Sequence, residues 1–327
     1  MSHALLYPNS EPHLLFSLQF RTPPFLMISS SLLLHRRCFH LMRPPLHISG
    51  ITSRPQSLFL SSSSHSSLPR RPELRKYERN PSKYWNDFYK RHHNKFFKDR
   101  HYLEKDWGRY FSSPSENREA PLGPKIVLEV GCGAGNTLFP LLVAFPEILV
   151  HACDFSPHAI ELLKENGNLR SDQVNAFVCD VTMDNLCEHI KPASVDVVTM
   201  IFMLSAVPPV KMPLVLQNIK KVLKPNGYLL FRDYAMGDFA QEKLAEKNQI
   251  ISENFYARGD GTCAFYFSND LLSTLFERNG FKTVEINVYC KQIVNHLRNV
   301  VMNRRWIRGT FCNFEHPDIH QQTLADS

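Results

Sequence analysis

Several features are missing from this sequence, and each absence excludes a class of protein. No apolar run approaches the roughly 18 residues that a membrane helix needs. The nearest run, around residues 25–34, is interrupted by Ser29, Ser30 and Ser31, so we expect no membrane segment. The eight cysteines form no Cys-x-x-Cys pair, so we expect no zinc site of the usual spacing and no other metal. The 327 residues suit one large α/β domain with extensions, or two small domains.

Acidic residues are nearly absent from residues 1–72. This segment holds seven Arg, no Lys and a single acid, Glu11, in a Ser-, Leu- and Pro-rich composition. Such a composition is typical of an organelle transit peptide followed by a disordered linker. We therefore expect import into the mitochondrial matrix or the chloroplast stroma. A disordered tail without a targeting role is the alternative, and initiation at Met27 or Met42 would give a cytosolic form.

The net charge of +7 is unevenly distributed. Residues 73–100 and 291–308 carry +5 each, whereas residues 101–290 carry −6. Two basic flanks on a mildly acidic body favour a polyanionic partner. The alternative for either flank alone is ordinary solvated surface charge.

From residue 125 the sequence alternates between strand and helix patterns, which predicts a parallel sheet covered on both faces. We expect strands at residues 126–130, 149–153, 176–179, 195–202, 228–231 and 281–289. We expect helices from the glycine turn to about residue 145 and at residues 157–166, 211–223 and 271–279. Before this core, Asn80 and Pro81 predict the start of a helix over residues 81–96, followed by a loop over residues 112–124.

Glycines and acids at the strand ends predict a nucleotide-type ligand. Gly131, Gly133 and Gly135 follow the first strand, where a glycine turn lets the backbone approach a ligand closely. Glu129 precedes the turn and can face an ammonium group. Asp154 ends the second strand and can accept both ribose hydroxyls, and Asp180 ends the third. The alternative for either aspartate alone is a turn or helix cap.

The glycine turn alone suits either a dinucleotide or S-adenosylmethionine. If the ligand is S-adenosylmethionine, a methyl donor, the sequence lacks the usual motifs for two kinds of methyl acceptor. Cytosine C5 methylation needs a Cys nucleophile, commonly presented as Pro-Cys, and this dipeptide does not occur. Exocyclic amino methylation commonly uses an Asp/Asn-Pro-Pro-aromatic loop after the fourth strand. Residues 205–210 (Ser-Ala-Val-Pro-Pro-Val) have neither the amide or acid nor the aromatic residue.

The ordered motifs resemble class I S-adenosylmethionine-dependent methyltransferases. They are the glycine turn, residues 154–160 (Asp-Phe-Ser-Pro-His-Ala-Ile), residues 179–181 (Cys-Asp-Val) and residues 223–227 (Leu-Lys-Pro-Asn-Gly). The more specific segments resemble the tRNA 3-methylcytidine methyltransferases of the methyltransferase-like family. These segments are residues 83–89, 95–100, 201–206, 231–234, 254–262 and 305–307. The resemblance covers about residues 76–308.

This resemblance implies a Rossmann-like α/β fold with a mostly parallel seven-stranded sheet, helices on both faces and an N-terminal helical extension. The corresponding division is an extension over residues 73–124, a core over residues 125–290 with an insertion at 236–267, and a basic segment and tail over residues 291–327. It further implies that S-adenosylmethionine is bound by Trp85, Tyr89, Gly131, Asp154, Asp180, Val181 and Ile201. Trp85 and Tyr89 share a helix face and could cover the cofactor. Their alternative role is packing of that helix onto the core.

The implied reaction forms 3-methylcytidine in the anticodon loop of tRNA. N3 of neutral cytosine has a free lone pair, so catalysis would rest on alignment and electrostatics. Asp233 or Asp260 could stabilise the cationic product, and Arg232 and Arg258 could hold phosphate or the cytosine carbonyl. A structural Arg–Asp pair in a turn is the alternative. Phe255, Tyr256 and Tyr266 are candidate stacking platforms, with core packing as their alternative. The residues expected to hold the tRNA backbone are Lys90, Arg91, Lys95, Arg304, Arg305 and Arg308.

Two other functions use the same fold. The first is a small-molecule or protein methyltransferase, which would have no use for the basic flanks. The second is a non-catalytic RNA-binding protein with a degenerate cofactor site, which the intact set of Glu129, Asp154 and Asp180 disfavours. Some members of the family that this chain resembles need a protein partner to select tRNA, so we also expect that a partner could aid this chain.

Overall fold

The computed structural model describes residues 72–112, 123–297 and 299–314. The transit peptide and linker expected over residues 1–72 lie outside this range except for Pro72, as does most of the loop expected over residues 112–124. Within the described residues, no helix combines the length and the apolar character that crossing a bilayer would require.

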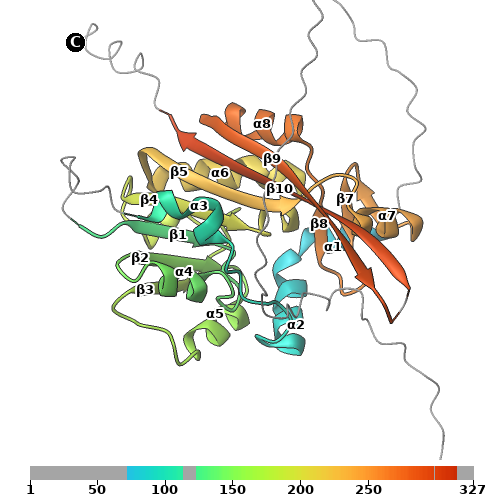
Figure 1. Ribbon diagram of the computed structural model, residues 1–327, viewed down its shortest axis with the longest axis horizontal. Helices are drawn as coiled ribbons and strands as arrows, with labels where there is room; N and C mark the ends of the chain where they lie inside the picture. Colours follow the sequence, from blue (N-terminus) through green and yellow to red (C-terminus); the bar gives the residue numbers. More distant parts are fainter. Residues whose placement is uncertain (1–71, 113–122, 298, 315–327) are drawn as a thin grey trace, which may run out of the picture. The chain divides into compact units, whose positions relative to one another are not determined.

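A seven-stranded sheet with the order β3-β2-β1-β4-β5-β10-β9 forms the centre of the fold (Figure 1). The strands from β3 to β5 are mutually parallel, whereas β10 is antiparallel to both of its neighbours. This arrangement confirms the Rossmann-like fold class. The strands are β1 (Ile126–Val130), β2 (Leu149–Asp154), β3 (Val174–Val178), β4 (Val195–Ile201), β5 (Leu223–Tyr234), β9 (Phe281–Asn295) and β10 (Val300–Asn313).

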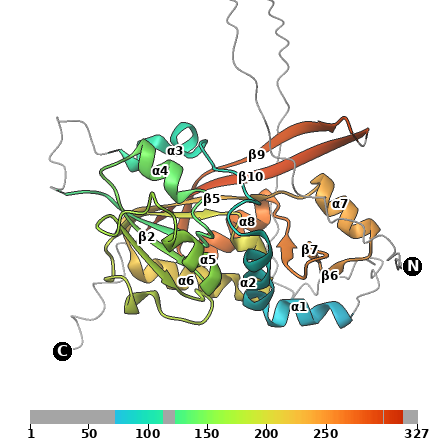
Figure 2. The ribbon, with the colours of Figure 1, turned by 90° about the horizontal axis from the view of Figure 1, so that it is seen from below.

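Helices cover both faces of the sheet (Figure 2). Apolar side chains of α3, α4 and α5 pack with one face of the strands, and those of α6 and α8 pack with the other. Because both faces are covered, β1 and β4 are buried along almost their whole length and are rich in Val and Ile. The helices are α1 (Arg75–Arg79), α2 (Pro81–His92), α3 (Leu103–Phe111), α4 (Leu138–Ala144), α5 (Pro157–Lys164), α6 (Met212–Val222) and α8 (Asn269–Arg278).

The insertion expected at residues 236–267 forms a small unit between β5 and α8. It contains α7 (Phe239–Glu246) and a three-stranded sheet of β6 (Ile250–Ser252), β7 (Phe255–Ala257) and β8 (Cys263–Phe265). Its turn at Gly261 packs against α2, because a Cβ there would lie 2.4 Å from the Tyr84 ring. The insertion therefore contacts the helix that carries Trp85 and Tyr89.

Helix α2 is shorter than the expected helix over residues 81–96. It ends at His92, and His93 has a left-handed φ of 52°. The chain turns here because Phe96 and Phe97 fold back onto Phe88, with ring centroids 4.8 and 5.6 Å away. The helical periodicity of the sequence does not predict that the helix ends at His92, because this end depends on contacts between aromatic rings in the turn that follows.

The C-terminal strands depart most from expectation. The strand expected to end at residue 289 continues to Asn295, and much of the segment assigned to a separate basic region forms β10 between β5 and β9. The apolar pattern of β10 is interrupted by Arg304, Arg305 and Arg308, although Ile307 and Phe311 on the same strand are fully buried. The sheet register therefore places charged and core residues on one strand.

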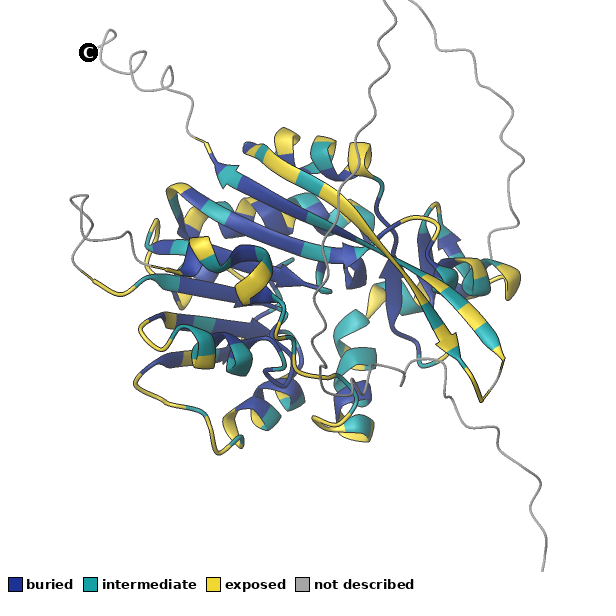
Figure 3. Cartoon of the chain, in the orientation of Figure 1, coloured by how far each residue is buried: buried dark blue, intermediate teal, exposed yellow. Residues whose placement is uncertain are grey.

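The β9–β10 hairpin extends beyond the sheet. β5 pairs with β10 from Trp306 to Cys312, whereas β9 continues to pair with β10 as far as Val300. Among the described residues, no third strand pairs with the part of the hairpin beyond Trp306, and the residues of that part are mostly exposed or half-buried (Figure 3). Residues near its base and along its length are available to a partner.

Helix α3 is tied to the antiparallel side of the sheet by polar contacts. Asp106 forms ion pairs of 2.9 Å with Arg232 on β5 and 2.9 Å with Arg308 on β10. The indole N–H of Trp107 donates to the Thr310 hydroxyl at 3.1 Å. These contacts join the N-terminal extension to the last strand of the chain.

The first prediction tests whether β10 is part of the core. The rings of Phe311 and Phe276 stack with centroids 3.6 Å apart, and both are fully buried. We expect Phe311→Ala to lower the free energy of unfolding by about 3–5 kcal/mol, because it leaves a cavity in the core. Urea unfolding measures the change, with the half-exposed Val288→Ala on β9 as the control. A loss of less than about 1 kcal/mol would show that β10 packs loosely.

Candidate active site

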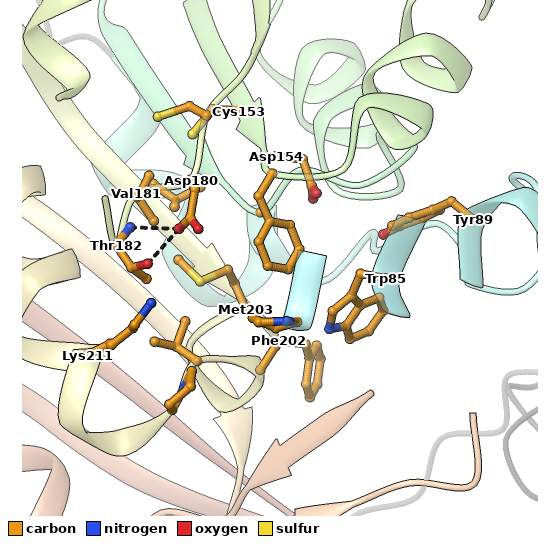
Figure 4. A pocket seen from close by; sticks show the side chains of 18 residues that line it. Trp85, Tyr89, Cys153, Asp154, Asp180, Val181, Thr182, Phe202, Met203 and Lys211 are labelled. Carbon is orange, nitrogen blue, oxygen red and sulfur yellow. Dashed lines mark hydrogen bonds between the residues drawn. The ribbon is translucent and has the colours of Figure 1, made fainter. Parts of the chain in front are cut away.

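The carboxyl ends of the parallel strands border a pocket of about 680 Å³ (Figure 4). This space includes the part of the pocket that is open to solvent. Six of the seven residues expected to bind cofactor line it: Trp85, Tyr89, Gly131, Asp154, Asp180 and Val181. Ile201 does not. Its side chain is buried in the core beside α3, and its carbonyl oxygen accepts a bond of 3.2 Å from Arg100.

The glycine turn is shaped by a close approach from α2. Gly133 has a φ of 55°, and a Cβ at this position would lie 2.3 Å from the Tyr89 hydroxyl oxygen. Tyr89 is buried beside Asp154, and burial raises the pKa of its phenol well above the usual value. Glycine is therefore required here for both backbone conformation and space.

Asp154 is buried at the end of β2 and is held by backbone donors. Its Oδ2 accepts from the Gly133 N–H at 3.0 Å, and its Oδ1 accepts from the Ser156 N–H at 2.9 Å. Burial raises the pKa of Asp154 to about 6, against the lowering effect of these two bonds. Each carboxylate oxygen can accept a further bond, so the group can receive a pair of hydroxyls.

At the end of β3, Asp180 combines a turn-capping role with access to the pocket. Its Oδ1 accepts from the Thr182 N–H at 3.0 Å and from the Thr182 hydroxyl at 2.7 Å. The side chain is half-buried and lines the pocket together with Val181. The Val181 N–H donates to no acceptor within the described ranges. This pair therefore leaves a carboxylate oxygen and an amide donor for a planar heterocycle.

Asn86 positions the aromatic cover, and the sequence analysis did not identify it. Its Oδ1 accepts from the Ser156 hydroxyl at 2.9 Å and from the His158 N–H at 3.0 Å. These bonds fix α2 to the start of α5, so Trp85 and Tyr89, with ring centroids 6.2 Å apart, face the pocket. The only signal for this role in the sequence is an Asn beside Trp85, which is too common to be informative.

Glu129 lies beneath the glycine turn and is almost completely buried, with 1% of its surface exposed. Burial raises its pKa to about 8, whereas Arg100 and a hydrogen bond from Thr137 lower it. Arg100 donates to the Thr137 hydroxyl at 3.0 Å. The described protein offers no hydrogen-bond partner to Glu129 Oε2, and Glu129 is not among the residues that line the pocket.

Comparison with known proteins identifies the type of site. A family model for a methyltransferase domain matches residues 128–229. The chain is 43% identical over 236 residues to the tRNA N(3)-cytidine methyltransferase METTL6 of Homo sapiens, which covers 72% of this chain and 81% of the relative. It is 38% identical over 240 residues to the tRNA N(3)-methylcytidine methyltransferase trm141 of Schizosaccharomyces pombe, covering 73% of this chain and 94% of the relative.

The chain belongs to the tRNA N(3)-cytidine methyltransferase family. Among solved structures, an S-adenosylmethionine-dependent methyltransferase from Anabaena variabilis matches with a TM-score of 0.50 and 15% identity. That match covers 71% of this chain and 94% of the other, and it concerns the fold alone.

The two acids predicted to assist catalysis do not line the pocket of this family member. Asp233 is fully buried, and its carboxylate accepts from the N–H groups of Ser205 and Tyr234, both at 2.9 Å. Burial raises the pKa of Asp233 to about 6. Asp260 Oδ1 accepts from the Thr262 N–H at 3.0 Å and the Thr262 hydroxyl at 2.7 Å. Both acids therefore hold backbone segments in the described structure, and direct contact with substrate stays a prediction.

Arg258 lies in the same turn as Asp260. It donates to the Thr262 hydroxyl and to the Cys263 carbonyl, each at 3.3 Å, and its guanidinium lies 5.4 Å from the Tyr234 ring centroid. Arg258 therefore supports this turn through Thr262 and Cys263, and it does not line the pocket. Phe255, Tyr256 and Tyr266 are buried, so none of them is an exposed stacking platform.

The predicted tRNA contacts fall into two groups. Lys90, Arg91 and Lys95 are exposed at the end of α2. Most of the others are engaged with acids or carbonyls: Arg232 and Arg308 with Asp106, Arg304 with Asp238 at 2.9 Å, and Arg305 with the Met236 carbonyl at 2.9 Å. The sequence shows the charges on the β9–β10 hairpin but not the acids that other elements bring to them.

The second prediction concerns Glu129. Its pKa is raised above the ordinary 4.5, so the folded protein without ligand loses stability as pH rises from about 4.5 to about 8. We expect Glu129→Gln to remove this loss, so the unfolding midpoint exceeds that of the wild type by more at pH 8 than at pH 5. The same variant should bind S-adenosylhomocysteine more weakly, because the ligand ammonium loses a carboxylate.

Thermal unfolding at the two pH values and calorimetry with S-adenosylhomocysteine measure these effects. The exposed Glu188→Gln serves as the control, for which neither quantity should change. If Glu129→Gln and the wild type show the same dependence of stability on pH, Glu129 is not the group that titrates.

Proposed function

We propose that this chain transfers the methyl group of S-adenosylmethionine to N3 of cytidine in tRNA, at a position in the anticodon loop. Membership of the tRNA N(3)-cytidine methyltransferase family carries this proposal, together with a pocket that suits the cofactor. The fit rests on the Trp85 indole N–H and the Val181 N–H, which belong to residues that line the pocket and are without partners in the described structure. S-adenosylmethionine supplies the methyl group on a sulfonium, a good leaving group.

The residues that line the pocket suit methyl transfer to an atom with a free lone pair better than methyl transfer to a group that must first lose a proton. Asp154 and Val181 would orient the nucleoside end of the cofactor, and Glu129 its ammonium end. Trp85 and Tyr89 would exclude water from above. Phe202 also lines the pocket, with a φ of 57° and its ring centroid 5.1 Å from that of Tyr234. Aromatic faces stabilise a cation, and 3-methylcytidine is cationic.

One face of the β9–β10 hairpin has the chemistry of an RNA interface. The paired residues Tyr289 and Trp306 stack, with ring centroids 5.8 Å apart, and Tyr289 is 51% exposed. The next pair on this face is Lys291 and Arg304, whose guanidinium lies 5.4 Å from the Trp306 ring centroid. Aromatic platforms beside cations are typical of single-stranded RNA recognition. Unlike the buried Tyr256 and Tyr266, this pair is accessible.

Nucleoside mass spectrometry tests the reaction directly. Purified protein, S-adenosylmethionine and unmodified tRNA should yield 3-methylcytidine, and cells lacking the protein should lose it from organellar or cytosolic tRNA. The appearance of a different methylated nucleoside would change the acceptor. A complete absence of product, with or without cell extract, would refute the proposed reaction, whereas product only with extract would indicate a protein partner.

The third prediction concerns the hairpin. We expect Trp306→Ala to weaken tRNA binding roughly tenfold, because base stacking on an aromatic ring contributes on the order of 1–3 kcal/mol. Affinity for S-adenosylhomocysteine should stay unchanged. Fluorescence anisotropy with labelled tRNA measures the change, and Val288→Ala on the same strand pair is the control. Equal tRNA affinity of Trp306→Ala and wild type would remove the hairpin from the interface.

The fourth prediction separates charge from stacking. Replacing Lys90, Arg91 and Lys95 together by Ala should reduce the slope of log affinity against log salt by up to about 2, because each phosphate contact releases counterions. Trp306→Ala should leave this slope unchanged. A triple variant with the wild-type salt slope would show that the end of α2 does not touch the tRNA backbone.

We also propose that residues 1–72 direct the chain to an organelle. Their composition supports this proposal: seven Arg, no Lys and one acid. The full chain with a C-terminal fluorescent tag should accumulate in mitochondria or plastids, and a chain starting at residue 73 should not. Identical distributions of the two chains would refute a targeting role.

A further inference from the structure

Four buried polar atoms close to the cofactor pocket have no protein partner. Among the described residues, no hydrogen-bond partner is found for Tyr102 Oη, Glu129 Oε2, Thr199 Oγ1 or Arg232 Nε. Burying a polar group without a partner is costly, and native proteins seldom do it. Four such atoms in one region therefore require a common explanation.

These atoms lie on one face of the sheet. Glu129 on β1 is the register partner of Thr199 on β4, and Ile201, two residues further on, is the partner of Arg232 on β5. Partners on neighbouring strands, and residues two apart on one strand, point to the same side. Ile201 belongs to the core beneath α3, so all of these residues face that helix.

Tyr102 closes the cluster from above. It directly precedes α3, and its ring centroid is 4.0 Å from the Arg232 guanidinium carbon. Burial raises the pKa of Tyr102, and both Arg232 and Glu129 contribute to its electrostatic surroundings. The hydroxyl is therefore near both of these residues.

The charged and titratable groups around Glu129 come from several elements. Arg100 and Tyr102 lie between α2 and α3, Asp154 ends β2, Cys132 is in the glycine turn, and Tyr89 is on α2. Arg232 and its ion-pair partner Asp106 complete the set at the side of Tyr102. The Thr137 hydroxyl already bonds to the Glu129 carboxyl. None of these contacts satisfies the four atoms named above.

We propose that Tyr102, Glu129, Thr199 and Arg232 form an internal water site that solvates the Glu129 carboxylate. The four atoms suit water, because the two hydroxyls and the Arg232 N–H can donate while Glu129 Oε2 accepts. Buried water typically makes about three hydrogen bonds to such groups. The site keeps a carboxylate ionisable beneath the glycine turn. The proposal concerns the protein without ligand, so it holds whether or not cytidine is the methyl acceptor.

The direction in which one substitution shifts the unfolding midpoint tests this site. Thr199→Val is nearly isosteric and suits a strand. If water bridges Thr199 and Glu129, the variant removes a water partner, and its unfolding midpoint at pH 7 should fall by roughly 2–4 °C. If the hydroxyl has no partner, its removal eliminates an unsatisfied group, and the midpoint should rise.

A double-mutant comparison makes the test specific. We expect the effect of Thr199→Val to shrink strongly in the Glu129→Gln background, and Tyr102→Phe to behave in the same way. Each single variant should also extend the fall of stability with pH to higher pH, because a less solvated Glu129 keeps its proton longer. Tyr228→Phe and Thr283→Val, outside the cluster, should show neither effect. Midpoints that rise equally in both backgrounds would overturn the proposal.

Discussion

The docking of Arg100 onto the ends of β1 and β4 is the contact on which the site depends. Its guanidinium donates to the Thr137 hydroxyl and to the Ile201 carbonyl, and it lies 5.2 Å from the Phe202 ring centroid. It also offsets part of the cost of burying Glu129. Because Arg100 follows α2 and precedes α3, a single cation fixes the N-terminal extension, the glycine turn and the strand end. Without it, the aromatic cover on α2 would depend on Asn86, on the bonds that the Asn136 amide donates to Phe97 and Asp99, and on apolar packing.

The last strands of the chain complete the same arrangement from the opposite direction. Asp106 on α3 joins Arg232 and Arg308, and Arg232 lies between the rings of Tyr102 and Tyr289, at 4.0 and 6.0 Å from their centroids. Tyr289 in turn stacks on Trp306. Contacts therefore run without interruption from Tyr102 through Arg232 and Tyr289 to Trp306 on the hairpin. Residues separated by about 200 positions in sequence meet because β10 is inserted between β5 and β9.

The sequence predicted the parts of this site that depend on local order along the chain. The glycine turn, Asp154 and Asp180 each follow a strand, and parallel strands bring their carboxyl ends to one edge. The same reasoning does not place Asp233 or Asp260 relative to the pocket. Asp233 accepts from Ser205, which is distant in sequence, and Asp260 accepts from Thr262 in its own turn. The same reasoning also did not predict β10, because the arginines in this segment obscure the apolar pattern of a buried strand. The charges in the sequence correctly indicated that the hairpin is basic. The sequence alone does not show that Trp306 pairs with Tyr289, because this pairing depends on the register of the two strands.

The composition of the pocket wall bears on the choice of methyl acceptor. A hydroxyl, a thiol or an ammonium must lose a proton before or during methyl transfer, and a positioned base usually takes it. Among the described residues, the pocket wall contains no His and no Glu, and we assign Asp154 and Asp180 to the nucleoside end of the cofactor. The remainder is aromatic or apolar, apart from the Thr182 hydroxyl, the thiols of Cys153 and Cys179, and the cationic Lys211. A nitrogen that already carries an available lone pair can accept a methyl group without a His or Glu side chain acting as a base. N3 of cytosine is such a nitrogen, so this wall is compatible with the acceptor that the family relationship indicates.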